Sequence, residues 1–296
     1  MTISLGLMMF PALMILIFIG FPVAFSLFGV AVLFGYIRFG DVLVHQLIAK
    51  VDDVASYYVL SAVPLFIFMG CMLEKSGVSE KLFEAVHLVT RKLPGGLAIA
   101  TVVLCVFFAA ASGVVGAAES VVGLMVISVM LRHGYDKGLI SGTICAGGSL
   151  GTIIPPSVVV VILSPIAGVG VGNLFVGIMF PGLILAGLYI VYILLRCSIW
   201  PEDGPSVDNG ESYGSIASQT WVVFSSLVPL FGLIFSVLGT IMLGWATPTE
   251  AGAMGAIGTI ILTILYRTFS WVLLKDAFLK ALRVTAMIMA ILLGGM

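Results

Sequence analysis

The residues most able to bind an ion lie at two places where an apolar stretch must lose its helical backbone. One is the glycine-containing segment Ser112–Gly116, and the other is Ile153–Ser157, which holds two adjacent prolines. Prolines have no N–H, so the carbonyls of Gly151 and Thr152 lose their i+4 partners, and the residue before each proline leaves the α region. Freed carbonyl oxygens suit a hard cation such as sodium. The alternative is a structural kink whose carbonyls are satisfied by neighbouring helices.

The segment Ser112–Gly116 could also receive an anion. Ser112 offers a hydroxyl, Gly113 and Gly116 permit a turn, and the helix that follows directs its positive end at the turn. Close packing of helices by small residues is the alternative. Glu119, a carboxylate inside an apolar stretch, is a further candidate; it could instead face a water-filled cavity or pair with a neighbour.

Together these residues predict one site that combines the two breaks. The predicted sodium ligands, mainly backbone carbonyls, are Ser112, Val115, Gly151, Thr152, Ile154 and Pro156. The predicted substrate contacts are Ser112, Gly113, Gly116 and Ser157, with Glu119 as an additional candidate ligand.

Two further motifs resemble functional sites, but their surroundings favour a structural role. Gly147–Gly151 matches the G-x-S-x-G pattern of hydrolases, but that pattern needs a preceding strand and a nearby histidine. All three histidines lie in interfacial stretches, so catalysis by Ser149 is only a rival hypothesis. Thr247–Glu250 fits a helix-capping box, with Pro248 in the first turn, better than an ion site.

The elements that must position these residues are membrane helices. Of the 296 residues, 61% are hydrophobic and only 9% are charged, against about 25% charged in soluble domains. The net charge of -1 gives no sign of nucleic-acid binding, and four isolated cysteines indicate buried thiols. The predicted fold class is an all-α polytopic membrane protein with an inverted repeat, a re-entrant hairpin and a proline-broken helix.

The apolar and polar runs predict the order of the elements. The expected elements are apolar runs at Ile3–Gly20 and Pro22–Ile37, a polar loop at Arg38–Ser56, a span at Tyr57–Leu73, an amphipathic interfacial helix within Ser76–Leu93, a hairpin at 97–131, a broken helix at 138–166, a span at Leu174–Cys197, a linker at Trp200–Gln219, spans at Trp221–Leu243 and Pro248–Tyr266, a basic stretch at Arg267–Arg283, and the start of another helix at Val284–Met296. The first two runs could also form one long kinked helix.

The hairpin follows from helix length. Leu97–Ala111 and Ala117–Leu131 contain 15 residues each. Each would reach only ~22 Å, short of a ~30 Å hydrocarbon core. A re-entrant hairpin is therefore favoured, and a single tilted helix loosened at the glycines is the alternative.

Charge supports the hairpin. With both of its ends on one side, 11 of the 13 Lys and Arg residues share that side, and only Arg38 and Lys50 lie opposite. The positive-inside rule makes the crowded side cytoplasmic.

The order of runs also indicates an inverted repeat. The pattern of Ile3–Leu73 recurs from Trp221 onward with opposite orientation. The predicted organisation is a first repeat half at 1–197, an acidic linker loop at 198–219, and the start of a second, incomplete half at 220–296. A second hairpin and a second proline break are expected after Met296.

Several ordered motifs resemble one known family. They are AVPLFIFMGCMLEKSG (62–77), LPGGLAIATVV (93–103), FAAASGVVGAAES (108–120), LRHGYDKGLISGTICAGGSLGTIIPPS (131–157) and WATPTEAGAMGA (245–256). Over essentially the whole chain, the sequence resembles the large membrane subunit (M, or DctM-type) of TRAP transporters. It departs from that family by ending short of the usual length and by having fewer serines at the hairpin tip.

The resemblance implies a transport subunit, not an enzyme, in the bacterial inner membrane. It implies sodium-coupled uptake of organic acids such as dicarboxylates, a periplasmic substrate-binding protein, a small four-helix (Q-type) membrane subunit, and elevator-type movement. No cofactor is expected beyond sodium as coupling ion. The rival hypotheses are an intramembrane serine hydrolase using Ser149 and a passive channel or scaffold subunit.

Overall fold

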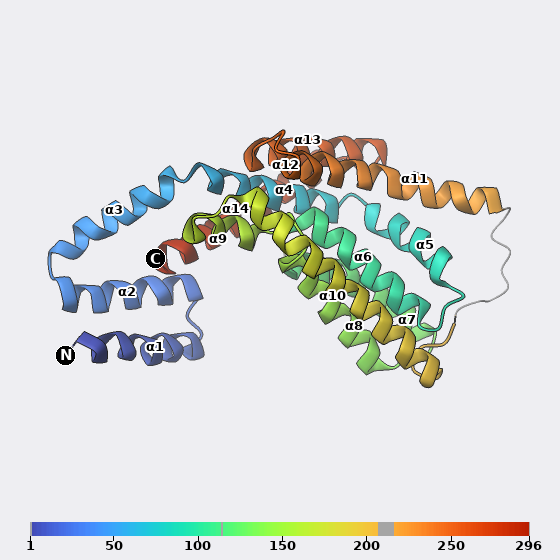
Figure 1. The fold of residues 1–296 in the computed structure, drawn as a ribbon, viewed down its shortest axis with the longest axis horizontal. Coiled ribbons are helices and arrows are strands. Elements are labelled where there is room, and N and C mark those ends of the chain that lie inside the picture. Colours follow the sequence, from blue (N-terminus) through green and yellow to red (C-terminus); the bar gives the residue numbers. More distant parts are fainter. Residues whose placement is uncertain (1, 114, 207–215, 296) are drawn as a thin grey trace. The chain divides into compact units, whose positions relative to one another are not determined.

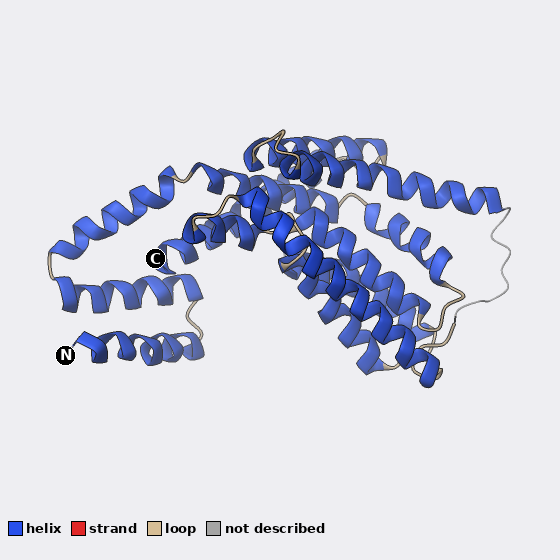
Figure 2. Cartoon of the chain, in the orientation of Figure 1, coloured by secondary structure: helices blue, strands red, loops and turns tan. Residues whose placement is uncertain are grey.

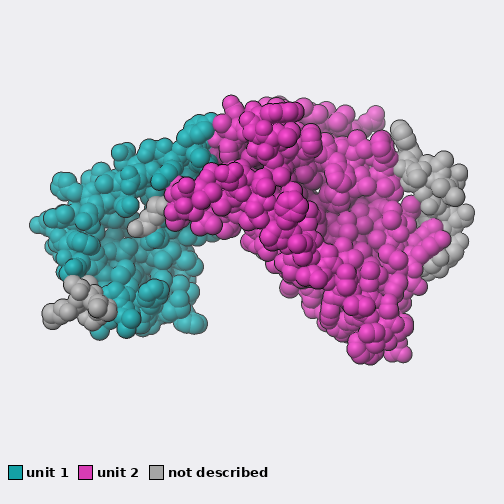
Figure 3. All heavy atoms as spheres, viewed as in Figure 1, with its two compact units in different colours: residues 1–61, 282–296 teal, residues 62–281 magenta. Residues whose placement is uncertain are grey.

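The structure is a computed structural model that describes residues 2–113, 115–206 and 216–295. Every regular element in these ranges is helical (Figures 1 and 2). The chain divides into two compact units, residues 1–61 with 282–296 and residues 62–281 (Figure 3). The predicted all-helical fold class is therefore confirmed.

The first unit begins with two separate helices, α1 (Thr2–Ile19) and α2 (Val23–Phe39). Gly20 has a φ of 101° and Pro22 caps α2. A left-handed glycine followed by a proline ends one helix and starts the next. The alternative of one long kinked helix is therefore excluded.

One predicted loop, and one basic stretch for which no helix was predicted, are in fact helical. The expected polar loop Arg38–Ser56 forms α3 (Val42–Ser56), and most of Arg267–Arg283 belongs to α14 (Trp271–Gly295). Both stretches carry charges on one face and apolar residues on the other, so their average hydropathy falls below that of a span although their helical period is intact.

The expected span Tyr57–Leu73 is helical from Tyr58 to Glu74 and begins with a 3₁₀ turn. A short 3₁₀ turn (Tyr58–Ser61) ends the first unit, and α4 (Ala62–Glu74) begins the second. Pro64 lies in the first turn of α4, where a missing N–H costs nothing. The rest of α4 is almost completely buried, so this helix is part of the protein core.

The second unit is organised around α6 (Gly96–Ser112). This helix packs against α4, α5 (Val78–Thr90), α7 (Val115–Arg132) and α8 (Lys137–Ser149). Leu97, Leu104 and Phe108 on α6 are fully buried. Because α6 ends at Gly113 and packs against α7, the two form a helical hairpin and the single-helix alternative is wrong. That both ends of the hairpin lie on one side of the membrane stays a prediction.

The predicted proline break is also present. α8 passes into a 3₁₀ turn (Leu150–Thr152), and α9 (Val158–Ala167) starts only after the two prolines, with the Pro155–Pro156 peptide in the cis form. α10 (Val171–Ile199) then follows. Cys145 on α8 is exposed, which corrects the expectation that all four thiols are buried.

Helices α11 (Ile216–Ile234) and α13 (Pro248–Leu265) pack on α4, α5 and α6 of this unit. α11, a π-helical turn (Phe235–Gly239) and α12 (Thr240–Met242) follow one another without a gap, so the expected span Trp221–Leu243 is one helix with a π-helical turn inside it. α13 packs along α4. It begins with the predicted capping box: the Thr247 N–H donates to Glu250 Oε2 at 2.8 Å, and the Glu250 N–H donates to Thr247 Oγ1 at 3.3 Å.

Three of the described helices, α10, α13 and α14, are long and apolar enough to cross a membrane. Many large apolar side chains on the helices stay exposed, for example Phe10, Phe18 and Leu124. Such surfaces are stable in lipid. The protein is therefore a multi-pass membrane protein.

Candidate functional site at the hairpin tip

The tip of the α6–α7 hairpin lies directly against the proline break. Gly113 ends α6 with a φ of 60°. A Cβ at this position would overlap the carbonyl oxygen of Pro156. The Gly113 carbonyl also accepts a hydrogen bond from the Val158 N–H at 3.4 Å. The structure thus brings together the two breaks that the sequence predicted as one site.

Ser157 gives this contact an unsatisfied hydroxyl. Its side chain is fully buried, and its Oγ has no hydrogen-bond partner in the described part of the chain. It is the N-cap residue of α9, but its side chain makes no capping hydrogen bond. Because buried polar groups are nearly always paired, this oxygen is well suited to bind a ligand.

The break also leaves main-chain oxygens without partners. Within the described ranges, no N–H donates to the carbonyls of Gly151, Thr152, Ile154 or Pro156. The Ile153 and Ile154 N–H groups both donate to Leu150 instead. The loss of backbone partners predicted for Gly151 and Thr152 is therefore present, and ion binding by these carbonyls stays a prediction.

Part of the predicted site lies beyond what the structure describes. The backbones of Ser112, Val115 and Gly116 belong to the two hairpin helices. The Ser112 and Val115 side chains lie outside the described residues, as does Val114 entirely. The described contact therefore consists of Gly113 on one side and the segment from Pro156 to Val158 on the other.

Two helices begin at this contact. α7 starts at Val115, immediately after the tip, and α9 starts at Val158, immediately after the break. Helix N-termini carry unpaired N–H groups and a partial positive charge. The same place thus offers oxygens for a cation and helix ends for an anion.

Two glycines at the end of α8 form a notch that receives both arms of the hairpin. A Cβ on Gly147 would lie 2.7 Å from Cys105 Sγ on α6, and a Cβ on Gly148 would overlap the side chain of Glu119 on α7. Glu119 is half-buried. The predicted additional ligand therefore packs against α8, and the structure gives it no described contact with Ser157.

Ser149 lies just beyond this notch and is not arranged as a nucleophile. It ends a helix rather than following a strand, and its hydroxyl donates to the Ala146 carbonyl at 2.7 Å. A nucleophile elbow needs a sharp strand-to-helix turn and a histidine base. This geometry argues against the hydrolase hypothesis.

A polar cluster that sequence reasoning missed fixes the opposite end of the hairpin. Arg196 Nε donates to Asp203 Oδ2 at 2.9 Å, and Arg196 Nη2 lies 3.7 Å from Asp136 Oδ1. Asp136 caps α8 by accepting from the Leu139 N–H at 2.9 Å. The cluster joins the end of α10, the start of α8 and the loop that follows α10.

The main chain reinforces this cluster. The Asp203 and Gly204 carbonyls accept from the N–H groups of Asp136 and Gly95, both at 3.0 Å. The Tyr135 hydroxyl accepts from the Leu97 N–H at 3.2 Å, and burial raises the pKa of Tyr135 to about 12. The first residues of the predicted linker are thus part of the packed structure.

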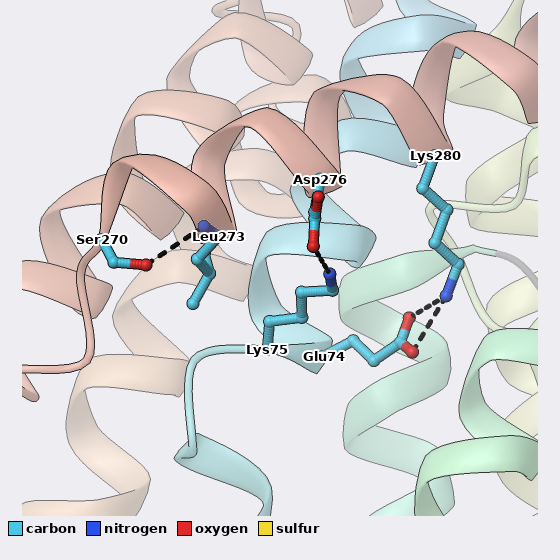
Figure 4. A network of polar contacts seen from close by, with 6 residues as sticks. All are labelled: Glu74, Lys75, Ser270, Leu273, Asp276 and Lys280. Atoms are coloured by element: carbon cyan, nitrogen blue, oxygen red, sulfur yellow. Dashed lines mark hydrogen bonds and ion pairs between the residues drawn. The ribbon is translucent and has the colours of Figure 1, made fainter.

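A second missed network joins α4 to α14 (Figure 4). Lys280 Nζ donates to both oxygens of Glu74, at 2.9 and 2.6 Å, and Lys75 Nζ lies 3.2 Å from Asp276 Oδ2. The Ser270 hydroxyl accepts from the Leu273 N–H at 3.1 Å at the start of α14. These contacts hold the end of the buried helix α4, which supports α6.

Comparison with known proteins identifies the family. The family described as "Tripartite ATP-independent periplasmic transporter, DctM component" matches residues 10–296. The chain is 32% identical to the C4-dicarboxylate TRAP transporter large permease protein DctM of Pseudomonas aeruginosa, over 86% of this chain and 58% of that protein. It is 34% identical to the protein of the same name from Vibrio cholerae, over 84% of this chain and 54% of that protein.

A further relative is named for another substrate. The isethionate TRAP transporter permease protein DctMQ of Oleidesulfovibrio alaskensis is 29% identical over 93% of this chain and 42% of its own length. This chain therefore spans about half the length of the relatives it matches. These relatives are transporters rather than enzymes. The chain belongs to the DctM component family of tripartite ATP-independent periplasmic transporters.

Proposed function

We propose that this chain forms part of the large permease of a sodium-coupled importer of organic acids in a bacterial inner membrane. It would receive its substrate from a periplasmic binding protein and act together with a small four-helix membrane subunit. The proposal assigns to this chain the transport function of its family. The contact between Gly113 and the Pro156 carbonyl is the observation that carries it, because it joins two helix breaks into one polar site.

Sodium coupling is supported by the ligands that the contact offers. The unpaired Ser157 hydroxyl and the free carbonyls of Gly151 and Thr152 are neutral oxygens. Neutral oxygen ligands suit weak, reversible binding of a monovalent cation. Transport requires such binding, since the ion must also leave.

An organic acid is supported by the two helix N-termini at the same place. The starts of α7 and α9 offer N–H groups to a carboxylate. Two relatives are named for C4-dicarboxylate and one for isethionate, so we propose an anionic organic acid such as a dicarboxylate.

The experiment is sodium-dependent uptake in proteoliposomes by a complete transporter containing this segment and its partner subunits. Ser157→Ala removes the unpaired hydroxyl, and we expect about a tenfold higher sodium concentration for half-maximal uptake, equal to about 1.4 kcal/mol. Ser141→Ala is the matched control, since Ser141 is exposed and donates only to the Gly138 carbonyl.

An unchanged sodium dependence in Ser157→Ala, with normal amounts of folded protein, would place the cation elsewhere. Full uptake by wild-type protein without sodium would refute the coupling itself.

A further inference from the structure

The first unit contains a groove of about 520 Å³ between α2 and α3. One face of each helix lines it. Phe28, Ala31 and Phe34 recur every third residue on α2, and Leu43 and Leu47 lie one turn apart on α3. Since these spacings place residues on one side of a helix, the lining of the groove is a continuous apolar surface.

Close approach of the two helices shapes one end of this groove. Gly35 on α2 faces Leu43 on α3, and a Cβ at Gly35 would lie 2.7 Å from Leu43 Cδ1. Met9 of α1 and Leu293 of α14 complete the apolar lining. The groove thus belongs entirely to residues 1–61 and 282–296.

The groove also carries two cations. Arg38, in the last turn of α2, and Lys50, one turn after Gln46 on α3, both line it. Among the described residues, Arg38 has no ion-pair partner, and Lys50 has only Asp53 at 3.6 Å, with both side chains more than half exposed. An exposed pair of this kind contributes little, so both cations can bind an anion.

The position of these two residues in the sequence is informative. They are the only Lys or Arg residues before Lys75, and the charge distribution predicts that they face away from the side holding the other eleven. The positive-inside rule disfavours basic residues there. Nevertheless, both of them line the same groove.

We propose that this groove binds one anionic phospholipid of the surrounding bilayer. An acyl chain would lie along Phe28, Ala31 and Leu47, and the phosphate would pair with Arg38 and Lys50. Gln46 can donate a hydrogen bond to an ester or phosphate oxygen. Basic pockets between membrane helices on the cytoplasmic side bind anionic headgroups by the same charge pairing.

A lipid explains the groove better than a partner helix does. An apolar helix would cover Phe28 and Leu47 but would leave Arg38 and Lys50 without a counter-charge. An anionic lipid meets both requirements with one molecule, because its chain is apolar and its headgroup is negative.

Native mass spectrometry of the purified, delipidated protein tests the proposal. Phosphatidylglycerol and phosphatidylcholine with identical acyl chains are titrated in parallel. We expect wild-type protein to retain phosphatidylglycerol preferentially, and Arg38→Gln with Lys50→Gln to reduce that preference about tenfold, or about 1.4 kcal/mol. The control is Arg132→Gln with Lys137→Gln, two exposed cations outside the groove, which should leave the preference unchanged.

A second variant separates the apolar lining from the charges. Ala31→Trp fills the groove, and we expect it to reduce retention of both lipids to a similar extent. Equal retention of the two lipids by wild-type protein would overturn the proposal. So would an equal loss of preference in the control pair. Photocrosslinking from position 46 to a protein subunit of the assembled transporter, with no lipid adduct, would assign the groove to a partner instead.

Discussion

At the scale of single residues, the site depends on glycines that allow close approach. Gly113 and Gly148 face a carbonyl oxygen and a glutamate side chain, respectively, where a Cβ would overlap. Gly113 also has a φ of 60°, which side chains rarely adopt. Both positions are therefore sensitive to the addition of a single methyl group.

Gly113→Ala should displace the hairpin tip from the proline break. The left-handed backbone alone costs roughly 1–2 kcal/mol for alanine, and the overlap with the Pro156 carbonyl adds to this. We expect at least about a tenfold rise in the sodium concentration for half-maximal uptake. Gly142→Ala is the control, because nothing lies within 4 Å of a Cβ there; equal effects of the two variants would contradict the assigned contact.

Gly148→Ala should destabilise the packing of α7 on α8 through its clash with Glu119. Overpacking of this kind costs roughly 1–3 kcal/mol. Shortening the opposing side chain should relieve the clash, so Glu119→Ala combined with Gly148→Ala should be more stable than Gly148→Ala alone. Thermal unfolding of the four proteins in a double-mutant cycle measures this coupling, and simple additivity would show that the two side chains do not meet.

At the scale of elements, the helix breaks are predictable from the sequence but their partners are not. Gly20, Pro22 and the two prolines before Ser157 impose local backbone rules that hold in any fold. α3 and the first part of α14, residues 271–283, escape prediction because their charged residues hide an intact helical period. The Glu74–Lys280 pair joins residues 206 positions apart, and no local rule finds such a contact.

The candidate site is also predictable only in part: its local backbone features follow from the sequence, but its tertiary contacts do not. Freed carbonyls at Gly151 and Thr152 follow from the missing N–H groups of the prolines. The contact of Gly113 with Pro156 depends on how the hairpin packs on α8, which only the folded structure gives. The packing of Glu119 against Gly148 likewise depends on how α7 and α8 pack together.

Pro155→Ala tests the break as an element. Alanine restores an N–H and favours a helix, so the Gly151 carbonyl could regain its i+4 partner. We expect the sodium concentration for half-maximal uptake to rise about tenfold. The amount of folded protein should not fall. Normal sodium activation in this variant would show that the Gly151 carbonyl is not a ligand.

Arg196→Gln tests the cluster at the base of the hairpin. The Arg196 side chain is about one-third exposed, so solvent weakens its ion pairs and the loss of stability should be small. A modest fall in Tm is expected, and it should shrink in high salt because ions screen exposed charges. Lys137→Gln, a neighbouring exposed cation, should not change Tm; an equal fall there would show that the Arg196 geometry is unimportant.

At the scale of the whole molecule, the hairpin predicts on which side of the membrane each loop lies. If α6 and α7 enter and leave on one side, position 133 shares a side with the basic loops, and position 45 lies opposite. The charge distribution makes the side of 133 cytoplasmic. Two single cysteines can decide this.

His133→Cys should react with an impermeant thiol reagent only from the cytoplasm, and His45→Cys only from the opposite side. Both are placed in a background with Cys145→Ser, because Cys145 is the exposed native thiol among the described residues. Labelling is compared in intact cells and inside-out vesicles. Reaction of both positions from the same side would refute the re-entrant hairpin.

The free carbonyls at the proline break cannot be removed by substituting side chains. Main-chain oxygens are present whatever the side chain is, so no substitution at Gly151 or Thr152 deletes its carbonyl. In an alanine scan, substitutions at the prolines and glycines that shape the backbone would change uptake. Substitutions at the residues that contribute only a carbonyl oxygen would not. Substitutions of side chains therefore leave these main-chain oxygens in place. Replacing individual amides by esters, which weakens a single carbonyl as an acceptor, is the substitution that reaches these atoms.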